Sequence, residues 1–189
     1  MILLDPELEP APATGRQEIS VRTLGRFLAQ AQTAVRLRGE VSVLLTADRT
    51  IRRLNRQYRG KNKTTDVLSF PVERLVQEKE KIAGDLAISV EMARRQGAAC
   101  GHPLATEVKV LILHGLLHLA GYDHESDDGR MARRERQLRA RLGLPQGLID
   151  RNSAHQSLRP KDRRTAGARP TAGGVPDGRA NKKRKQVSV

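Results

Sequence analysis

Residues 104–120 constrain the fold of this 189-residue chain more than any other segment. Most of their side chains are apolar, and they directly follow Gly101-His-Pro, which predicts a long helix. A helix with apolar residues on nearly every side has to be covered by other elements of the fold. His114 and His118 interrupt this segment, and two imidazoles in such surroundings need polar partners.

Strands and helices alternate through the first part of the chain, and three helices then follow one another. Short apolar segments predict strands at Ile2–Leu4, Glu40–Thr46, Asp66–Phe70 and Ile82–Ser89. Apolar residues three and four positions apart predict helices after Ser20, after Thr46, and at Val90–Ala99, Leu104–Ala120 and about Ser126–Leu142. This order predicts a single α+β domain, with about five helices covering a small mixed sheet of about four strands.

The sequence also predicts two local features of these helices. Thr46 and Ser89 each precede a helix and are expected to cap its first turn through their hydroxyl groups. In the helix after Thr46, the residues Ile51, Leu54 and Tyr58 have the spacing of a buried side.

The positive charge of the chain is concentrated toward its C-terminal end. The formal net charge is +14, of which residues 151–189 carry +9. Leu, Ile, Val and Phe make up about 10% of this segment but about 27% of residues 1–150, and a charged segment so poor in them usually stays disordered. We therefore expect an N-terminal strand and loop segment at 1–18, a folded domain at 19–150 and a disordered basic tail at 151–189. Such a tail binds phosphates without any fold.

Composition also excludes several classes of protein. No stretch approaches the ~18 consecutive apolar residues of a membrane-spanning helix, and no signal peptide is recognisable. The single cysteine, Cys100, excludes an internal disulfide and fits a reducing compartment such as the cytoplasm. The aromatic residues are too few for a platform on which bases stack: Phe27, Tyr58, Phe70 and Tyr122.

The histidines of the apolar segment have the spacing of a metal site. His114 and His118 are four residues apart, so both project from the same face of a helix. Gly121 can adopt the left-handed conformation that ends a helix, which would return His124 to the same point. Three histidine ligands leave one position of a tetrahedral ion open, as in catalytic zinc sites, whereas structural zinc sites usually have four protein ligands.

The residue types at this site restrict the class of reaction that it can catalyse and the charge of its substrate. Position 115 is glycine, where HExxH metallopeptidases have their general-base glutamate, and this disfavours a peptidase. Three neutral ligands leave the full charge of a divalent ion, which lowers the pKa of a water ligand and attracts an anionic substrate. The last predicted helix adds a cationic surface through six arginines: Arg130, Arg133, Arg134, Arg136, Arg139 and Arg141.

Three blocks of the sequence resemble the YbeY family of bacterial rRNA-maturation endoribonucleases. Residues 114–124 read His-Gly-Leu-Leu-His-Leu-Ala-Gly-Tyr-Asp-His. Residues 54–61 read Leu-Asn-Arg-Gln-Tyr-Arg-Gly-Lys and lead to Thr-Asp-Val-Leu-Ser-Phe-Pro at 65–71. Residues 84–89 read Gly-Asp-Leu-Ala-Ile-Ser. Together the blocks cover most of residues 20–142 in the family's order and spacing.

The resemblance implies a single-strand-specific, metal-dependent endoribonuclease in late-stage maturation of the 16S rRNA 3′ end and in quality control of the 70S ribosome. It implies one Zn²⁺ per chain with His114, His118 and His124 as ligands, and Arg59 and His114 as catalytic residues. Its partners would be rRNA, the ribosome and ribosome-associated proteins. A non-catalytic ribosome-assembly factor, stabilised by its metal, is the alternative. The sequence is compatible with both hydrolysis and attack by the RNA 2′-hydroxyl group.

Arg59 also has a physical rationale of its own. It follows a predicted helix and opens a loop from which a guanidinium group can reach a cleft. Arginine binds phosphate with a planar pair of hydrogen bonds and stabilises charge that develops on phosphoryl oxygens, although a solvated surface arginine is the alternative interpretation. Asp85 and Asp123 are candidates to orient a ligand histidine, with a strand-end hydrogen bond and a turn as their respective alternatives.

Overall fold

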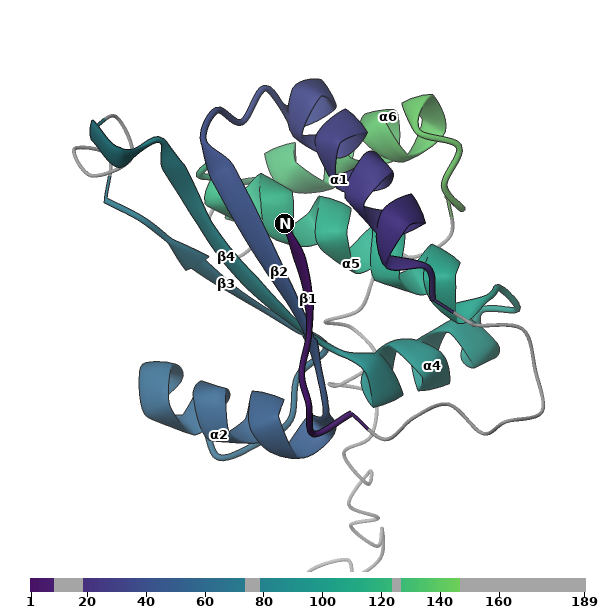
Figure 1. Ribbon diagram of the computed structural model, residues 1–189. Helices are drawn as coiled ribbons and strands as arrows, with labels where there is room; N and C mark the ends of the chain where they lie inside the picture. Colours follow the sequence, from purple (N-terminus) through teal and green to yellow (C-terminus); the bar gives the residue numbers. More distant parts are fainter. Residues whose placement is uncertain (9–18, 74–78, 124–126, 147–189) are drawn as a thin grey trace, which may run out of the picture. The chain divides into compact units, whose positions relative to one another are not determined.

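A computed structural model of the chain describes residues 1–8, 19–73, 79–123 and 127–146 (Figure 1). The described elements are β1 (Ile2–Leu4), α1 (Val21–Val35), β2 (Glu40–Thr46), α2 (Asp48–Arg59), β3 (Val67–Pro71), β4 (Ile82–Ser89), α4 (Val90–Ala99), α5 (Leu104–Leu119) and α6 (Arg130–Arg141). They confirm the predicted α+β fold with a small mixed sheet. The predicted domain limits at residues 18 and 150, and the tail at 151–189, lie outside the described residues and stay predictions.

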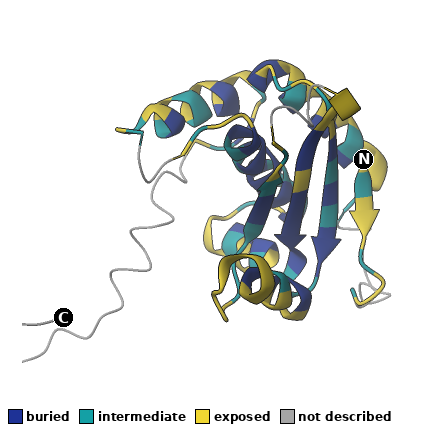
Figure 2. Cartoon of the chain, turned by 90° about the vertical axis from the view of Figure 1, so that its left-hand side faces the viewer, coloured by how far each residue is buried: buried dark blue, intermediate teal, exposed yellow. Residues whose placement is uncertain are grey.

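The strands form one mixed sheet in the order β1-β2-β4-β3. β1 pairs with β2 and β2 with β4 in parallel, whereas β3 pairs with β4 in the antiparallel direction. Figure 2 shows that β2 and β4 are largely buried and that β1, at one edge, is mostly exposed. Parallel neighbours need a crossover connection, and α1 supplies it between β1 and β2.

Helices cover both faces of the sheet. Successive residues of a strand point to opposite faces, so their contacts show which helices cover each face. Leu86 and Ile88 of β4 belong to the main core, which they share with residues of α1 and α5. Ala87, between them, belongs to a smaller cluster with Ile51 of α2 and Leu68 of β3. α1 and α5 therefore cover one face of the sheet and α2 covers the other, as Figure 1 shows.

α5 is the central helix of the domain. It contacts β3, β4, α1, α4 and α6, and its apolar side chains are buried as predicted. A Cβ atom at Gly115 would lie 2.7 Å from Cδ2 of Leu86, so glycine permits the close packing of α5 on β4. The residue that disfavours a peptidase thus has a packing role of its own. No helix in the described part of the chain is long and apolar enough to cross a membrane.

Two local predictions for α2 are wrong. The N-cap position of α2 is Ala47, because the hydroxyl group of Thr46 donates its hydrogen bond to the carboxylate of Asp5 instead. Tyr58 is 60% exposed rather than buried, with its ring edge-on to Phe70 at a centroid distance of 5.1 Å. Both differences arise from contacts with other segments, which helical spacing does not reveal.

The two helices that flank α5 differ in how well the sequence predicts them. Ser89 caps α4 as predicted, since its Oγ accepts a hydrogen bond from the backbone N–H of Met92 at 3.0 Å. α6 begins at Arg130, later than predicted, because Gly129 before it adopts the left-handed conformation with φ of 77°. The carboxylate of Asp127 accepts a hydrogen bond from the backbone N–H of Met131 at 2.7 Å, which stabilises this first turn.

Candidate functional site

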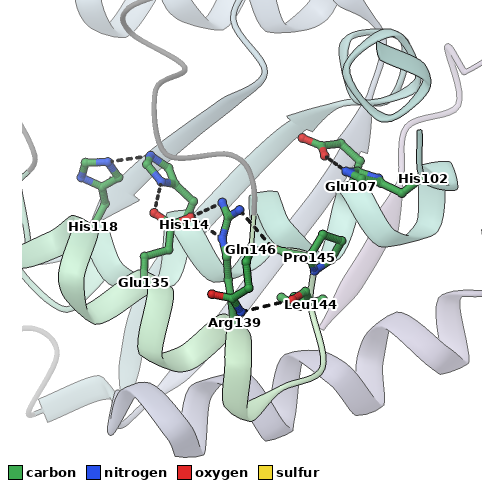
Figure 3. Close-up of polar contacts among 9 residues, drawn as sticks. All are labelled: His102, Glu107, His114, His118, Glu135, Arg139, Leu144, Pro145 and Gln146. Carbon is green, nitrogen blue, oxygen red and sulfur yellow. Dashed lines mark hydrogen bonds and ion pairs between the residues drawn. The ribbon is translucent and has the colours of Figure 1, made fainter. Parts of the chain in front are cut away.

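His114 and His118 lie one turn apart on α5, with their imidazole rings facing each other (Figure 3). Their Nε2 atoms are 3.2 Å apart and their ring centroids 4.8 Å apart. Both side chains are half-buried, so a ligand from solvent can reach them. The prediction that the two histidines project from one face of the helix is confirmed.

A carboxylate from α6 contacts the opposite side of the His114 ring. Oε2 of Glu135 lies 3.1 Å from Nδ1 of His114. Oε1 of Glu135 accepts hydrogen bonds from the guanidinium group of Arg139, one of them from Nε at 3.0 Å. Arg139 is itself buried and also donates to the carbonyl oxygen of Pro145 at 3.4 Å. Figure 3 shows the resulting chain of side chains from His118 to Arg139.

The ionised state of Glu135 determines which nitrogen of His114 carries the proton. Burial alone would raise the pKa of Glu135, but the hydrogen bond with His114 and the electrostatic interactions with His114 and Arg139 lower it to about 2. An ionised carboxylate only accepts hydrogen bonds, so Nδ1 of His114 must donate. In the neutral ring, Nε2 then has a lone pair on the side of His118, which is the tautomer that a metal-ligating histidine requires.

Sequence reasoning missed Glu135. The sequence suggests Asp85 and Asp123 for orienting a histidine, and these are exposed on β4 and after the end of α5, respectively. One signal was available, because Glu135 is the sole acidic residue between positions 129 and 149 and stands four residues before Arg139. That spacing predicts the ion pair but not the contact with a histidine 21 residues away.

The third predicted ligand, His124, lies outside the described residues. The turn that leads toward it follows the prediction, because Gly121 has a φ of 86° and donates a backbone hydrogen bond to the carbonyl oxygen of His118 at 3.0 Å. Among the residues that are described, no group of three His, Cys, Asp or Glu side chains could hold a metal ion. The assignment of His114, His118 and His124 as metal ligands therefore stays a prediction.

Arg59 is the last residue of α2 and is exposed. Its Nη2 atom donates to the carbonyl oxygen of Ser69 on β3 at 3.5 Å, which is a long hydrogen bond. β3 is an edge strand, and α5 packs against it, so Arg59 is tied to a neighbour of the helix that carries the histidines. The loop after Arg59 is anchored by Asn55, which donates to the carbonyl oxygen of Lys63 at 2.7 Å. The catalytic role of Arg59 stays a prediction.

The arginines of α6 contribute less to a cationic surface than their number indicates. Arg139 is buried against Glu135, and Arg134 donates to the carbonyl oxygen of Ala34 on α1 at 3.0 Å. Arg133 donates to the carbonyl oxygen of Asp128 at 3.1 Å. Arg134 thereby joins α6 to α1, whereas the contact of Arg133 is local to the start of α6.

A further pair in Figure 3, a histidine with a glutamate, is separate from this site. Nε2 of His102 lies 3.2 Å from Oε2 of Glu107, a fully buried residue near the start of α5. Gly97 of α4 packs against the same turn, where a Cβ atom would lie 3.0 Å from the carbonyl oxygen of His102. This pair joins the loop between α4 and α5 to the first turn of α5, which is a structural role.

The fold and the facing histidines together define an α+β domain with a candidate metal centre on its central helix. The family model for "Endoribonuclease YbeY" matches residues 14–143. The chain is similar to the endoribonuclease YbeY of Koribacter versatilis, with 47% identity over 135 residues that cover 71% of this chain and 86% of the relative. It is also similar to that of Solibacter usitatus, with 46% identity covering 75% of this chain and 89% of the relative.

The chain therefore belongs to the endoribonuclease YbeY family. This confirms the predicted family and the predicted class of enzyme, a nuclease. The solution structure of TM1509 from Thermotoga maritima is a further match, with 25% identity, a TM-score of 0.49, and coverage of 75% of this chain and 89% of that chain.

Proposed function

We propose that this chain is a zinc-dependent endoribonuclease that cleaves single-stranded RNA in late-stage maturation of the 16S rRNA 3′ end and in quality control of the 70S ribosome. Membership of an endoribonuclease family supports RNA as the substrate. The ribosome and its associated proteins are the partners, and the cytoplasm is the compartment. The observation that carries the proposal is the facing pair of Nε2 atoms on α5, with Glu135 behind His114.

The geometry of the histidine pair fits a shared zinc ion. Zinc–nitrogen bonds of about 2.0–2.1 Å in a tetrahedral arrangement separate two ligand nitrogens by about 3.3 Å. The Nε2 atoms of His114 and His118 are 3.2 Å apart, and imidazole is a ligand that zinc accepts well. His124 is the third ligand in this proposal. When bound, the ion supplies a Lewis acid that activates water and polarises a phosphoryl oxygen.

Glu135 orients His114 toward the ion, so Glu135→Gln is expected to weaken zinc binding about 10–100-fold. The amide keeps the shape of the side chain but loses the negative charge that fixes the proton on Nδ1 of His114. Zinc affinity is measured by competition with a chromophoric chelator, with the exposed β2 residue Glu40→Gln as the matched control. If a folded Glu135→Gln chain bound zinc with wild-type affinity, Glu135 would have no role in zinc binding.

Arg59 binds the phosphate of the bond that is cleaved. Its side chain is exposed at the end of α2, and the long contact with Ser69 is easily exchanged for a stronger charged partner. The guanidinium group can donate two parallel hydrogen bonds to one phosphate, which positions the phosphate and stabilises negative charge as it develops.

The experiment that tests this function is cleavage of an unstructured RNA by the purified full-length chain, before zinc removal, after it and after zinc is returned. The expected results are cleavage by the zinc-loaded chain, loss of cleavage in the zinc-free chain and recovery with about one zinc equivalent. The same RNA in a perfect duplex should resist cleavage. Cyclic phosphate and 5′-hydroxyl product ends would identify attack by the 2′-hydroxyl group. Equal cleavage with and without zinc would contradict the proposal.

A further inference from the structure

The outer face of α2 carries a row of exposed arginines outside the histidine site. Arg49, Arg52, Arg53 and Arg56, here called the α2 arginine face, line a groove of about 650 Å³ together with Gln57 and Asn62. α2 covers the face of the sheet opposite α5, so this groove and the facing histidines lie on different helices. No predicted function of the chain uses these four arginines.

Little in the described part of the chain neutralises the α2 arginine face. Nε of Arg52 donates to Oδ1 of the uncharged Asn62 at 2.9 Å, and Nη1 of Arg53 lies 4.0 Å from a carboxylate oxygen of Glu7. Arg49 and Arg56 have no side-chain hydrogen bond or ion pair among the described residues. The face therefore carries an excess of positive charge.

The acidic residue of α2 is directed away from this face. The carboxylate of Asp48 lies 2.7 Å from Nη2 of Arg95 on α4 and also accepts a hydrogen bond from Ser89. Like charges three and four residues apart on a helix repel each other and destabilise the helix. A polyanion bound along the α2 arginine face would relieve this repulsion.

The α2 arginine face leads directly to Arg59. Arg49 and Arg56 are separated by about 10 Å along the helix axis, and Arg59 follows one turn later at the same helix end. Guanidinium groups bind phosphates in pairs of hydrogen bonds, and a row of them along one axis suits a chain of phosphates better than a single anion.

We infer that the α2 arginine face is a docking surface for the RNA backbone, which it guides toward Arg59. The inference rests on the proposed function, since RNA is the substrate and Arg59 is the residue at the cleaved phosphate. The recognised chemistry is the phosphate backbone, so the surface contributes affinity without reading sequence.

The test is the salt dependence of binding to an unstructured 2′-O-methyl oligoribonucleotide, which has the phosphates of RNA but no free 2′-hydroxyl group. The variant is Arg49→Ala with Arg56→Ala in the full-length chain, because both side chains are exposed. The matched control is Arg22→Ala with Arg26→Ala, two exposed arginines on α1 that remove the same charge from another helix. Fluorescence anisotropy gives the affinity, and circular dichroism verifies the fold.

Log affinity falls as log salt rises, and this slope should be shallower by about 1.4 in the Arg49 and Arg56 double variant, since each single-strand phosphate contact contributes about 0.7 to its magnitude. Its affinity at about 0.1 M salt should fall about 10–30-fold, while the control should stay close to wild type. A wild-type slope in the double variant, or an equal loss in both variants, would overturn the inference. Failure of the wild-type chain to cleave RNA would overturn the proposed function. The binding experiment would still test the α2 arginine face, because it does not depend on cleavage.

Discussion

Replacing His118 by alanine is expected to remove zinc from the chain and to lower the rate of RNA cleavage by about three orders of magnitude or more. His118 supplies one of the two Nε2 atoms that lie 3.2 Å apart on α5. Glu135 contacts His114, so the substitution at position 118 leaves that contact and the buried Arg139 in place. The loss should therefore come from the metal site rather than from unfolding.

The His118→Ala variant needs zinc content, cleavage rate and fold measured on one preparation. Zinc content is determined by mass spectrometry, cleavage under single-turnover conditions, and the fold by circular dichroism. His155→Ala, a histidine outside the predicted ligand set, is the control and should keep both zinc and activity. A folded His118→Ala chain that cleaves RNA at the wild-type rate would exclude this site as the catalytic centre.

Replacing Arg59 by alanine is expected to lower the maximal rate of cleavage about 10²–10³-fold while zinc content stays at the wild-type level. Arg59 is exposed, and its contact with Ser69 is long at 3.5 Å, so its removal should not disturb the fold. The charge that develops on the phosphoryl oxygens would lose a donor that is always protonated. The rate should fall even at saturating RNA.

Arg59→Lys tests whether cleavage depends on the planar guanidinium group of Arg59 or only on its positive charge. Lysine keeps the positive charge but not the planar pair of donors, so it should restore only part of the activity. Arg22→Ala, which removes an exposed arginine from α1, is the matched control and should leave the maximal rate unchanged. Unchanged cleavage in Arg59→Ala would show that Arg59 is a solvated surface residue with no role in catalysis.

Local sequence patterns predict most elements of this fold but not the order of its strands. The predicted strands at Ile2–Leu4, Glu40–Thr46 and Ile82–Ser89 coincide with β1, β2 and β4. The order β1-β2-β4-β3 places Val43 beside Leu86, and such pairing depends on contacts between distant segments. The cap predicted at Thr46 is wrong for the same reason, since Asp5 accepts its hydrogen bond across 41 positions.

The candidate site is predictable where it depends on one helix and not where it depends on two. His114 and His118 face each other because residues four apart lie on one side of α5. Glu135 reaches His114 only because α6 packs against α5, and no spacing within α6 indicates that contact. The α2 arginine face was likewise missed, because a run of exposed arginines in a sequence does not show where the nearby carboxylates point.

One experiment that measures zinc content and RNA cleavage in the wild-type chain, His118→Ala and Arg59→Ala tests the proposed roles of these two residues together. We expect both variants to lose cleavage and only His118→Ala to lose zinc, because one residue holds the ion and the other binds the phosphate. Wild-type cleavage in both variants would exclude the proposed active site, since neither the facing histidines nor the arginine at the end of α2 would then take part in the reaction.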